Sequence, residues 1–222
     1  QPGSVVVVGD ARFSVLTPCL IRMEHSPSGR FRDQATQVVI DRDFPVPQFS
    51  VTKRDGRVEI RTDKLRLTYG GGAFGPSSLS VTMLSAAQTS HNTTWHYGDP
   101  EFATYPMFGN QGGTARTLDE VDGAIALEPG LISSYGYSTL DDSGSLFLTR
   151  DGWVTAPGFE EEDLYFFGYG LDHGATLRAF FHLTGASPLL PRKTLGNWWS
   201  RFHAYSADEY LGLMDDFAAP RV

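Results

Sequence analysis

The residues in this sequence that could do acid–base chemistry are mainly carboxylates. The runs Asp141-Asp142 and Glu160-Glu161-Glu162 place carboxyl groups side by side, and two carboxyl groups can share the acid and base roles of glycoside hydrolysis. Both runs lie in turn-like sequence, where we expect solvated side chains without the raised pKa that a general acid needs. They are therefore not predicted to form a catalytic pair.

Other common signatures of catalytic or metal sites are missing from the sequence. It has no Gly-rich phosphate loop before a helix, no HExxH, no GxSxG and no Cys/His pairs at metal-ligand spacing. The six His residues are scattered, and Cys19 lies between Pro18 and apolar residues, the context of a buried structural thiol. No metal, cofactor or catalytic residue is predicted in these 222 residues.

Composition and charge exclude several classes of partner. The 24.4 kDa chain has a net charge of −8 and no Lys/Arg cluster, so a nucleic-acid backbone would be repelled. Its longest apolar runs, such as Val5 to Val8, are far shorter than the roughly 20 residues of a membrane span. We expect neither nucleic acid nor a membrane as partner. No targeting segment is recognisable, which leaves a cytoplasmic or a secreted location open.

The elements that must position any site are expected to be mostly strands. Apolar residues recur at period two from Val5 to about Leu84, the pattern of an antiparallel β-sandwich, and Asp55-Gly56 is a hairpin signal. The period returns after residue 136, so the fold class is predicted to be mainly β. Strands are predicted at residues 12–16, 20–24, 36–40, 49–52, 58–61, 65–69, 79–83, 136–140, 145–149, 153–156 and 164–169.

One long segment, from about residue 105 to 131, lacks this periodicity. It combines several glycines with carboxylates that include Asp119, Asp122 and Glu128. A long irregular stretch inside a compact domain is usually a binding loop or lid. A solvated surface excursion is the alternative.

The carboxyl-terminal part changes to helical periodicity. A helix is expected over 172–183 with Gly185 as its stop, residues 195–202 are interpreted as one strand, and Ser206 with Glu209 predicts a capping box for a second helix. Strand followed by helix is the opening of a βα repeat, which needs parallel neighbours and a helix layer. We therefore expect a second domain to begin here.

Two segments resemble the glycoside hydrolases of family 31, chiefly α-glucosidases. The stronger comprises LPRKTLGNWWSRF at residues 190–202 and AYSADEY at 204–210, and it looks like the start of that family's catalytic barrel. The other is GGTARTLD at 112–119, continuing through Asp122-Gly123 and Leu127-Glu128, and it is similar to one branch of the family. The resemblance extends over nearly the whole chain.

This resemblance implies a galactose-mutarotase-like β-sandwich over 1–187, then a linker and the first βα unit of a truncated (β/α)8 barrel over 188–222. It implies a retaining enzyme that releases terminal non-reducing α-linked glucose from an oligosaccharide, with one Asp attacking and another donating a proton. Those two carboxylates belong to later barrel strands. The chain alone is expected to be inactive, and the remaining barrel is its expected partner.

Four substrate-binding residues follow from the resemblance. Asp122 aligns roughly with the family's pocket loop, with Asp119 and Glu128 behind it. Phe202 holds the place of an aromatic residue, often Trp, at the end of the first barrel strand, and its smaller ring lacks an indole N–H. The alternatives are carboxylates that cap turns inside the loop and a phenylalanine in the core.

Two rival interpretations stay open at this point. The aromatic content, 13% of residues, also fits a stand-alone carbohydrate-binding β-sandwich, which would have no use for an amphipathic carboxyl-terminal helix. A mutarotase-like sandwich enzyme would need a His and a carboxylate paired in the sheet, which the scattered His residues do not demand.

Overall fold

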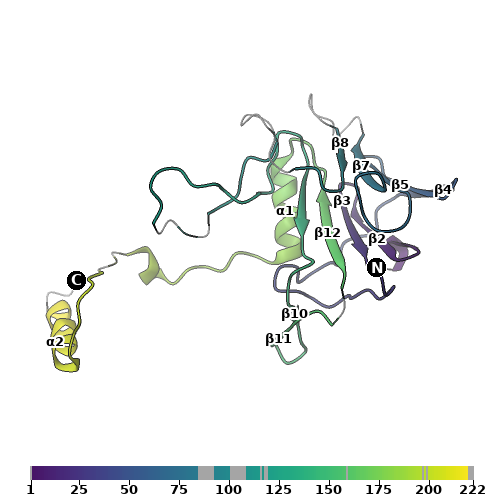
Figure 1. Ribbon diagram of the computed structural model, residues 1–222. Coiled ribbons are helices and arrows are strands. Elements are labelled where there is room, and N and C mark those ends of the chain that lie inside the picture. The colour runs from purple at the N-terminus through teal and green to yellow at the C-terminus, as the bar shows by residue number, and fades with distance from the viewer. Residues whose placement is uncertain are drawn as a thin grey trace. The chain divides into compact units, whose positions relative to one another are not determined.

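The computed structural model describes residues 2–84, 93–100, 109–115, 117, 120–158, 160–196, 198 and 200–219. The chain forms two compact units, residues 1–186 and 187–222. The described part is mainly β, with antiparallel strands and two α-helices (Figure 1). The predicted mainly β class is therefore confirmed.

The first unit contains two five-stranded sheets and a two-stranded ribbon. The first sheet has the order β1 (Val5–Val8), β2 (Ala11–Thr17), β3 (Leu20–His25), β12 (Glu162–Phe167), β9 (Ser138–Asp141). The second sheet is a meander of β4 (Ser50–Arg54), β5 (Arg57–Arg61), β6 (Leu65–Tyr69), β7 (Leu79–Met83) and β8 (Thr94–His96). The ribbon is β10 (Phe147–Leu148) with β11 (Val154–Thr155), and a 3-10 helix (Pro2–Ser4) precedes β1.

The two sheets enclose one apolar core, as in a β-sandwich. Phe13 and Phe166 of the first sheet are fully buried together with Leu67 and Val81 of the second. In β6 and β7 the buried residues alternate with half-exposed ones because only one face of that sheet is covered. All six residues of β3 are buried, so the first sheet is covered on both faces.

Helix α1 (His173–Thr184) covers part of the outer face of the first sheet. The Asp172 carboxylate accepts a hydrogen bond from the Ala175 amide at 2.9 Å, and Gly185 ends the helix with a φ of 81°. Ala179 and Leu183 pack in a second apolar cluster with residues of β2, β3 and β12. The predicted helix and its glycine stop are confirmed.

The strand predicted over residues 36–40 is wrong. Thr36 makes only an isolated bridge with Phe147, and its hydroxyl accepts from the Val39 amide at 2.8 Å. The amides of Ile40 and Asp41 both donate to the Leu183 carbonyl at the end of α1. The segment therefore finds its hydrogen bonds in a turn and a helix end, which an alternating apolar pattern cannot indicate.

The rest of that outer face carries buried ion pairs. Arg12 binds Glu24 through Nε and Nη2 at 2.7 and 2.6 Å, and Arg22 binds Asp163 in the same way at 2.8 and 2.6 Å. Arg22 Nη2 is also 3.1 Å from Glu24. These pairs link β2 to β3 and β3 to β12, and removing one partner would leave an uncompensated buried charge.

The second unit contains a 3-10 helix (Arg192–Leu195) and helix α2 (Ala207–Ala218). The capping box is present, with Ser206 accepting from the Glu209 amide and Glu209 accepting from the Ser206 amide at 2.8 Å. The strand predicted over 195–202 is wrong for the residues that are described there. No strand partner is available to them in the described part of this unit, and a lone strand leaves its backbone groups unpaired. A barrel start is therefore not seen.

Candidate functional site

The predicted binding loop rises from an ordered stem. The Gln111 amide donates to the Ile132 carbonyl at 2.8 Å, the Gly113 amide to the Glu128 carbonyl at 2.6 Å, and the Glu128 amide to the Thr114 carbonyl at 3.0 Å. The stem is thus two antiparallel segments of backbone, and the described residues 115, 117 and 120–127 lie in the part of the loop beyond it. In Figure 1 the loop is the teal segment that extends from the sandwich.

Asn110 closes the base of the stem. Its side chain is buried, its amide donates to the Gly130 carbonyl at 2.7 Å, and its Oδ1 accepts from the amides of Gly112 and Gly130 at 2.9 and 2.8 Å. Sequence reasoning missed this residue. Its signal is the cluster of glycines around it, which marks a close approach of two backbones.

The stem needs glycine at several positions because a larger side chain would clash with the opposite backbone. A Cβ on Gly130 would lie 2.5 Å from the Gly112 carbonyl oxygen, and a Cβ on Gly113 would lie 3.0 Å from the Pro129 carbonyl oxygen. Gly112 also has a φ of 81°, which other residues rarely adopt. The glycines that broke the strand periodicity therefore fix the geometry of the loop.

The predicted carboxylates of the loop lie in different parts of it. Asp122 is exposed beyond the stem, and Glu128 is exposed at the head of the stem, where its backbone makes two stem hydrogen bonds. Asp119 lies outside the described residues. One loop therefore presents Asp122 and Glu128 to solvent, and their role in binding stays a prediction.

Phe202, the fourth predicted residue, belongs to the second unit. It is fully exposed there and lies in no helix or strand. Trp198 is 76% exposed, and its indole N–H donates to the Thr194 carbonyl at 3.0 Å. Within this unit, then, Phe202 is not a core residue.

Helix α2 is amphipathic but uncovered within its unit. None of its described residues is buried, and its exposed apolar side chains are Tyr210, Leu211, Met214 and Phe217. Tyr205 stacks edge-on against both His203 and Tyr210, with ring centroids 4.4 and 6.0 Å apart. A soluble helix normally buries such a face, so α2 offers a surface for further packing.

Two carboxylates expected to be solvated are not. Asp142 is buried and accepts from the Thr36 hydroxyl at 2.8 Å, and burial raises its pKa. Burial, with Asp163 and Glu24 nearby, raises the pKa of Glu161 to about 7. Their neighbours Asp141 and Glu160 are exposed, as predicted. The expectation failed chiefly because the fold buries parts of these two side chains, which a local turn pattern does not show, and nearby carboxylates add to the effect.

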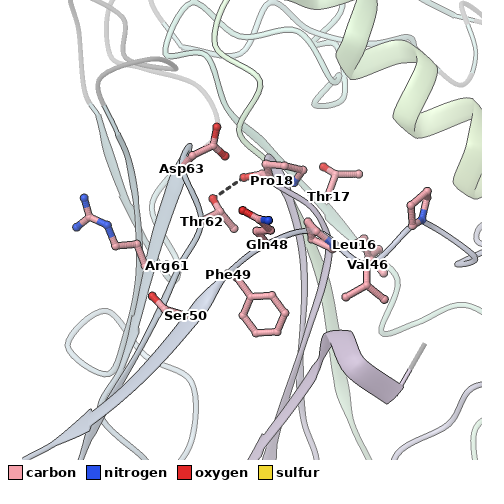
Figure 2. Close-up of a pocket in the computed structure, with 12 residues that line it drawn as sticks. Leu16, Thr17, Pro18, Val46, Gln48, Phe49, Ser50, Arg61, Thr62 and Asp63 are labelled. Carbon is pink, nitrogen blue, oxygen red and sulfur yellow. Dashed lines mark hydrogen bonds between the residues drawn. The ribbon is translucent and has the colours of Figure 1, made fainter.

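A cavity of about 890 Å³ lies where the chain crosses between the two sheets. Figure 2 shows the Phe49 ring in it, between the strand end that carries Arg61 and the end of β2 that carries Leu16. Thr62 closes one side by donating from its hydroxyl to the Pro18 carbonyl at 2.7 Å. The lining combines apolar and polar side chains, and among the described residues it includes no His or Cys and one carboxylate, Asp63.

Other reactive groups are few in the described ranges. There, no group of three or more His, Cys, Asp or Glu side chains could hold a metal ion. Cys19 is partly buried, and burial raises the pKa of its thiol to about 11, which keeps it protonated at neutral pH. No helix of the described residues has the length and apolar character needed to span a membrane.

Comparison with known proteins gives one kind of match. No family model and no curated protein matches the sequence. Among solved structures, the chain is similar to a GH31 dextranase of Flavobacterium johnsoniae in complex with glucose, at 15% identity and a TM-score of 0.46. A mutant of that enzyme with isomaltotriose gives 15% identity and a TM-score of 0.45. Each match covers 85% of this chain but only 27% of the dextranase chain.

Proposed function

We propose that this chain is the amino-terminal part of a retaining α-glucosidase that removes terminal non-reducing α-linked glucose from oligosaccharides. In this proposal the first unit supports a (β/α)8 catalytic barrel and contributes a loop to its substrate pocket. In the complete barrel, residues 195–202 of the second unit pair with neighbouring strands as the first strand, and α2 is the first helix. The two catalytic carboxylates lie on later barrel strands, so the chain alone does not turn over substrate.

The observation that carries the proposal is the loop on its fixed stem. Asn110 and three stem glycines hold its base, while Asp122 stays exposed beyond the stem. An ionised carboxylate accepts several hydrogen bonds at once, which suits neighbouring hydroxyls of a sugar ring. A rigid base with an exposed carboxylate is what a loop needs to complete a pocket built elsewhere.

The second unit supports the proposal through its uncovered apolar surface. A complete barrel would cover the apolar side of α2. It would cover the exposed side chains of Trp198 and Phe202 or place them at its mouth. Carboxyl-terminal ends of barrel strands face the active site, so Phe202 is assigned to the pocket wall, where its ring can pack on the C–H surface of a pyranose.

The proposal is tested by hydrolysis of p-nitrophenyl α-glucoside. Residues 1–222 alone should release no nitrophenol, whereas the same residues produced in one polypeptide with a following barrel should do so. Activity of the isolated chain that a substitution within it abolishes would contradict the assignment. Failure of the complete protein to cleave any α-glucoside would contradict it equally.

A further inference from the structure

A second cavity, of about 450 Å³, lies over the outer face of the first sheet, apart from the loop. It is bounded by β2, β3, the 3-10 helix before β1 and the segment from Asp33 to Asp43. Three guanidinium groups and three carboxylates share the polar part of its lining: Arg12, Arg22, Arg42, Asp33, Asp41 and Asp43.

The guanidinium groups form the buried side of the cavity. The side chains of Arg22 and Arg12 are only 3% and 11% exposed, and their bonds to Glu24 and Asp163 use Nε and Nη2 of each. Within the described residues, Nη1 of both groups is left for another acceptor. The cavity lining therefore includes two guanidinium groups whose Nη1 has no acceptor in the described part of the chain.

Arg42 also lines the cavity, but its guanidinium group is held within the protein. Its Nε donates to the Tyr165 hydroxyl at 2.5 Å and its Nη1 to the Gln34 carbonyl at 3.0 Å. Its Nη2 is buried and makes no hydrogen bond with any described residue, since Asp142 Oδ2 is 3.8 Å away. Because Nη2 has almost no accessible surface, a ligand in the cavity cannot reach it. Arg42 therefore contributes positive charge to the lining, and the donors open to a ligand are those of Arg12 and Arg22.

The carboxylates form the exposed side of the cavity. Asp33 is 82% exposed and lies 2.8 Å from Arg12 Nη2, and Asp41 is 51% exposed. Asp41 Oδ1 accepts from the Asp43 amide at 2.8 Å, which fixes the direction of its carboxylate. The cavity is therefore lined by guanidinium donors on its buried side and by carboxylate acceptors on its exposed side.

The charges around the cavity select the ligand. Glu24, Asp163 and Asp142 lie beneath the three guanidinium groups, and the rim carboxylates add further negative charge, so an anion would be repelled. A cation would meet the guanidinium groups at the base. A neutral ligand whose hydroxyls both donate and accept satisfies both sides. We propose that this cavity is a non-catalytic binding site for a neutral carbohydrate.

The site goes beyond the proposed function, because it uses neither the loop nor the second unit. Only the choice of a glucose oligomer as probe rests on that function. The test is titration of ¹⁵N-labelled residues 1–222 with maltotriose, following the backbone amides of Ser14 and Arg42 and the Nε–H signals of Arg12 and Arg22. We expect saturable shifts of these signals.

Variants separate this cavity from the rest of the surface. Asp33→Asn at the exposed side of the cavity should weaken maltotriose binding about tenfold, the loss expected for one charged hydrogen bond. Asp41→Asn should also weaken binding, and it keeps the Oδ1 acceptor of an exposed side chain, so folding is preserved. The matched control is Arg61→Gln in the cavity of Figure 2, which should leave the affinity unchanged.

The contrary results are equally definite. The site would be overturned by an absence of saturable shifts with maltotriose or by saturable shifts with inorganic phosphate instead. An affinity that neither Asp33→Asn nor Asp41→Asn changes would also overturn it. Hydrolysis of p-nitrophenyl α-glucoside by the complete protein does not depend on this cavity. Failure of the carbohydrate site is therefore distinguishable from failure of the proposed function.

Discussion

The two units differ in how far they bury their apolar side chains. The first unit buries Phe13, Phe166 and their neighbours between two sheets, and it packs Leu183 of α1 against the outer face of one of them. The second unit leaves Trp198, Phe202 and one side of α2 exposed. The first unit therefore has its stabilising core within itself, whereas the second has local structure without a core of its own.

The two helices show which interactions are local. Both α1 and α2 begin with a side-chain cap, Asp172 in one and Ser206 in the other. Helix α1 buries Thr176, Ala179 and Leu183, while α2 buries none of its described residues. Capping and helical propensity are enough to define a helix in the chain, but covering its apolar side depends on a second surface.

The largest expected difference between the units is in the cost of removing a phenylalanine ring. Phe166→Ala leaves a cavity between the sheets and should lower the free energy of unfolding by about 3–5 kcal/mol. The matched change Phe217→Ala on the exposed side of α2 should cost about 0.5 kcal/mol or less. Urea unfolding of residues 1–222 measures both. Equal losses would mean that the second unit is packed as firmly as the first.

A smaller effect is expected from Glu161, whose pKa is raised to about 7. A carboxyl group with a raised pKa in the folded state stabilises below its unfolded pKa, and this contribution is lost as the pH rises through the folded value. Glu161→Gln should therefore be more stable than the original protein by about 1 kcal/mol at pH 8, after allowance for solvent screening, and similar to it near pH 4.

The matched control for that change is the exposed neighbour, Glu160→Gln, which should have the pH dependence of the original protein. Urea unfolding at the two pH values gives both comparisons. A Glu161→Gln variant whose stability relative to the original protein is the same at both pH values would show that Glu161 does not carry the raised pKa.

Sequence patterns predicted the parts of the fold that depend on neighbours in the chain. The alternation of residues 65–69 and the Asp55-Gly56 turn, with φ of 50° and 73°, appear as expected. The strand at 195–202 failed because a strand needs partners, and β8 was not foreseen because it is only three residues long. The strands predicted at 145–149 and 153–156 shrink to the two-residue β10 and β11.

The same limit applies to the candidate site, where only features that depend on neighbours in the chain could be predicted. The break in periodicity located the loop of Asp122 and Glu128, but not Asn110, whose partners lie on both sides of the stem. The pairing of Arg22 with Asp163 spans 141 positions, and no local pattern shows it. Burial is the main cause of the raised pKa of Glu161, and Asp163 and the more distant Glu24 add to it.

The most direct test of the proposed function is the effect of Asp122→Asn on kcat/KM in the complete protein. Loss of charged hydrogen bonds to the sugar, each about 1.5–3 kcal/mol, should lower kcat/KM for an α-glucoside by about tenfold to a hundredfold at an unchanged melting temperature. Glu120→Gln, which removes a charge from the same loop, is the matched control and should change little. Unchanged kcat and KM in Asp122→Asn, or an equal loss in Glu120→Gln, would contradict a role for Asp122 in the pocket.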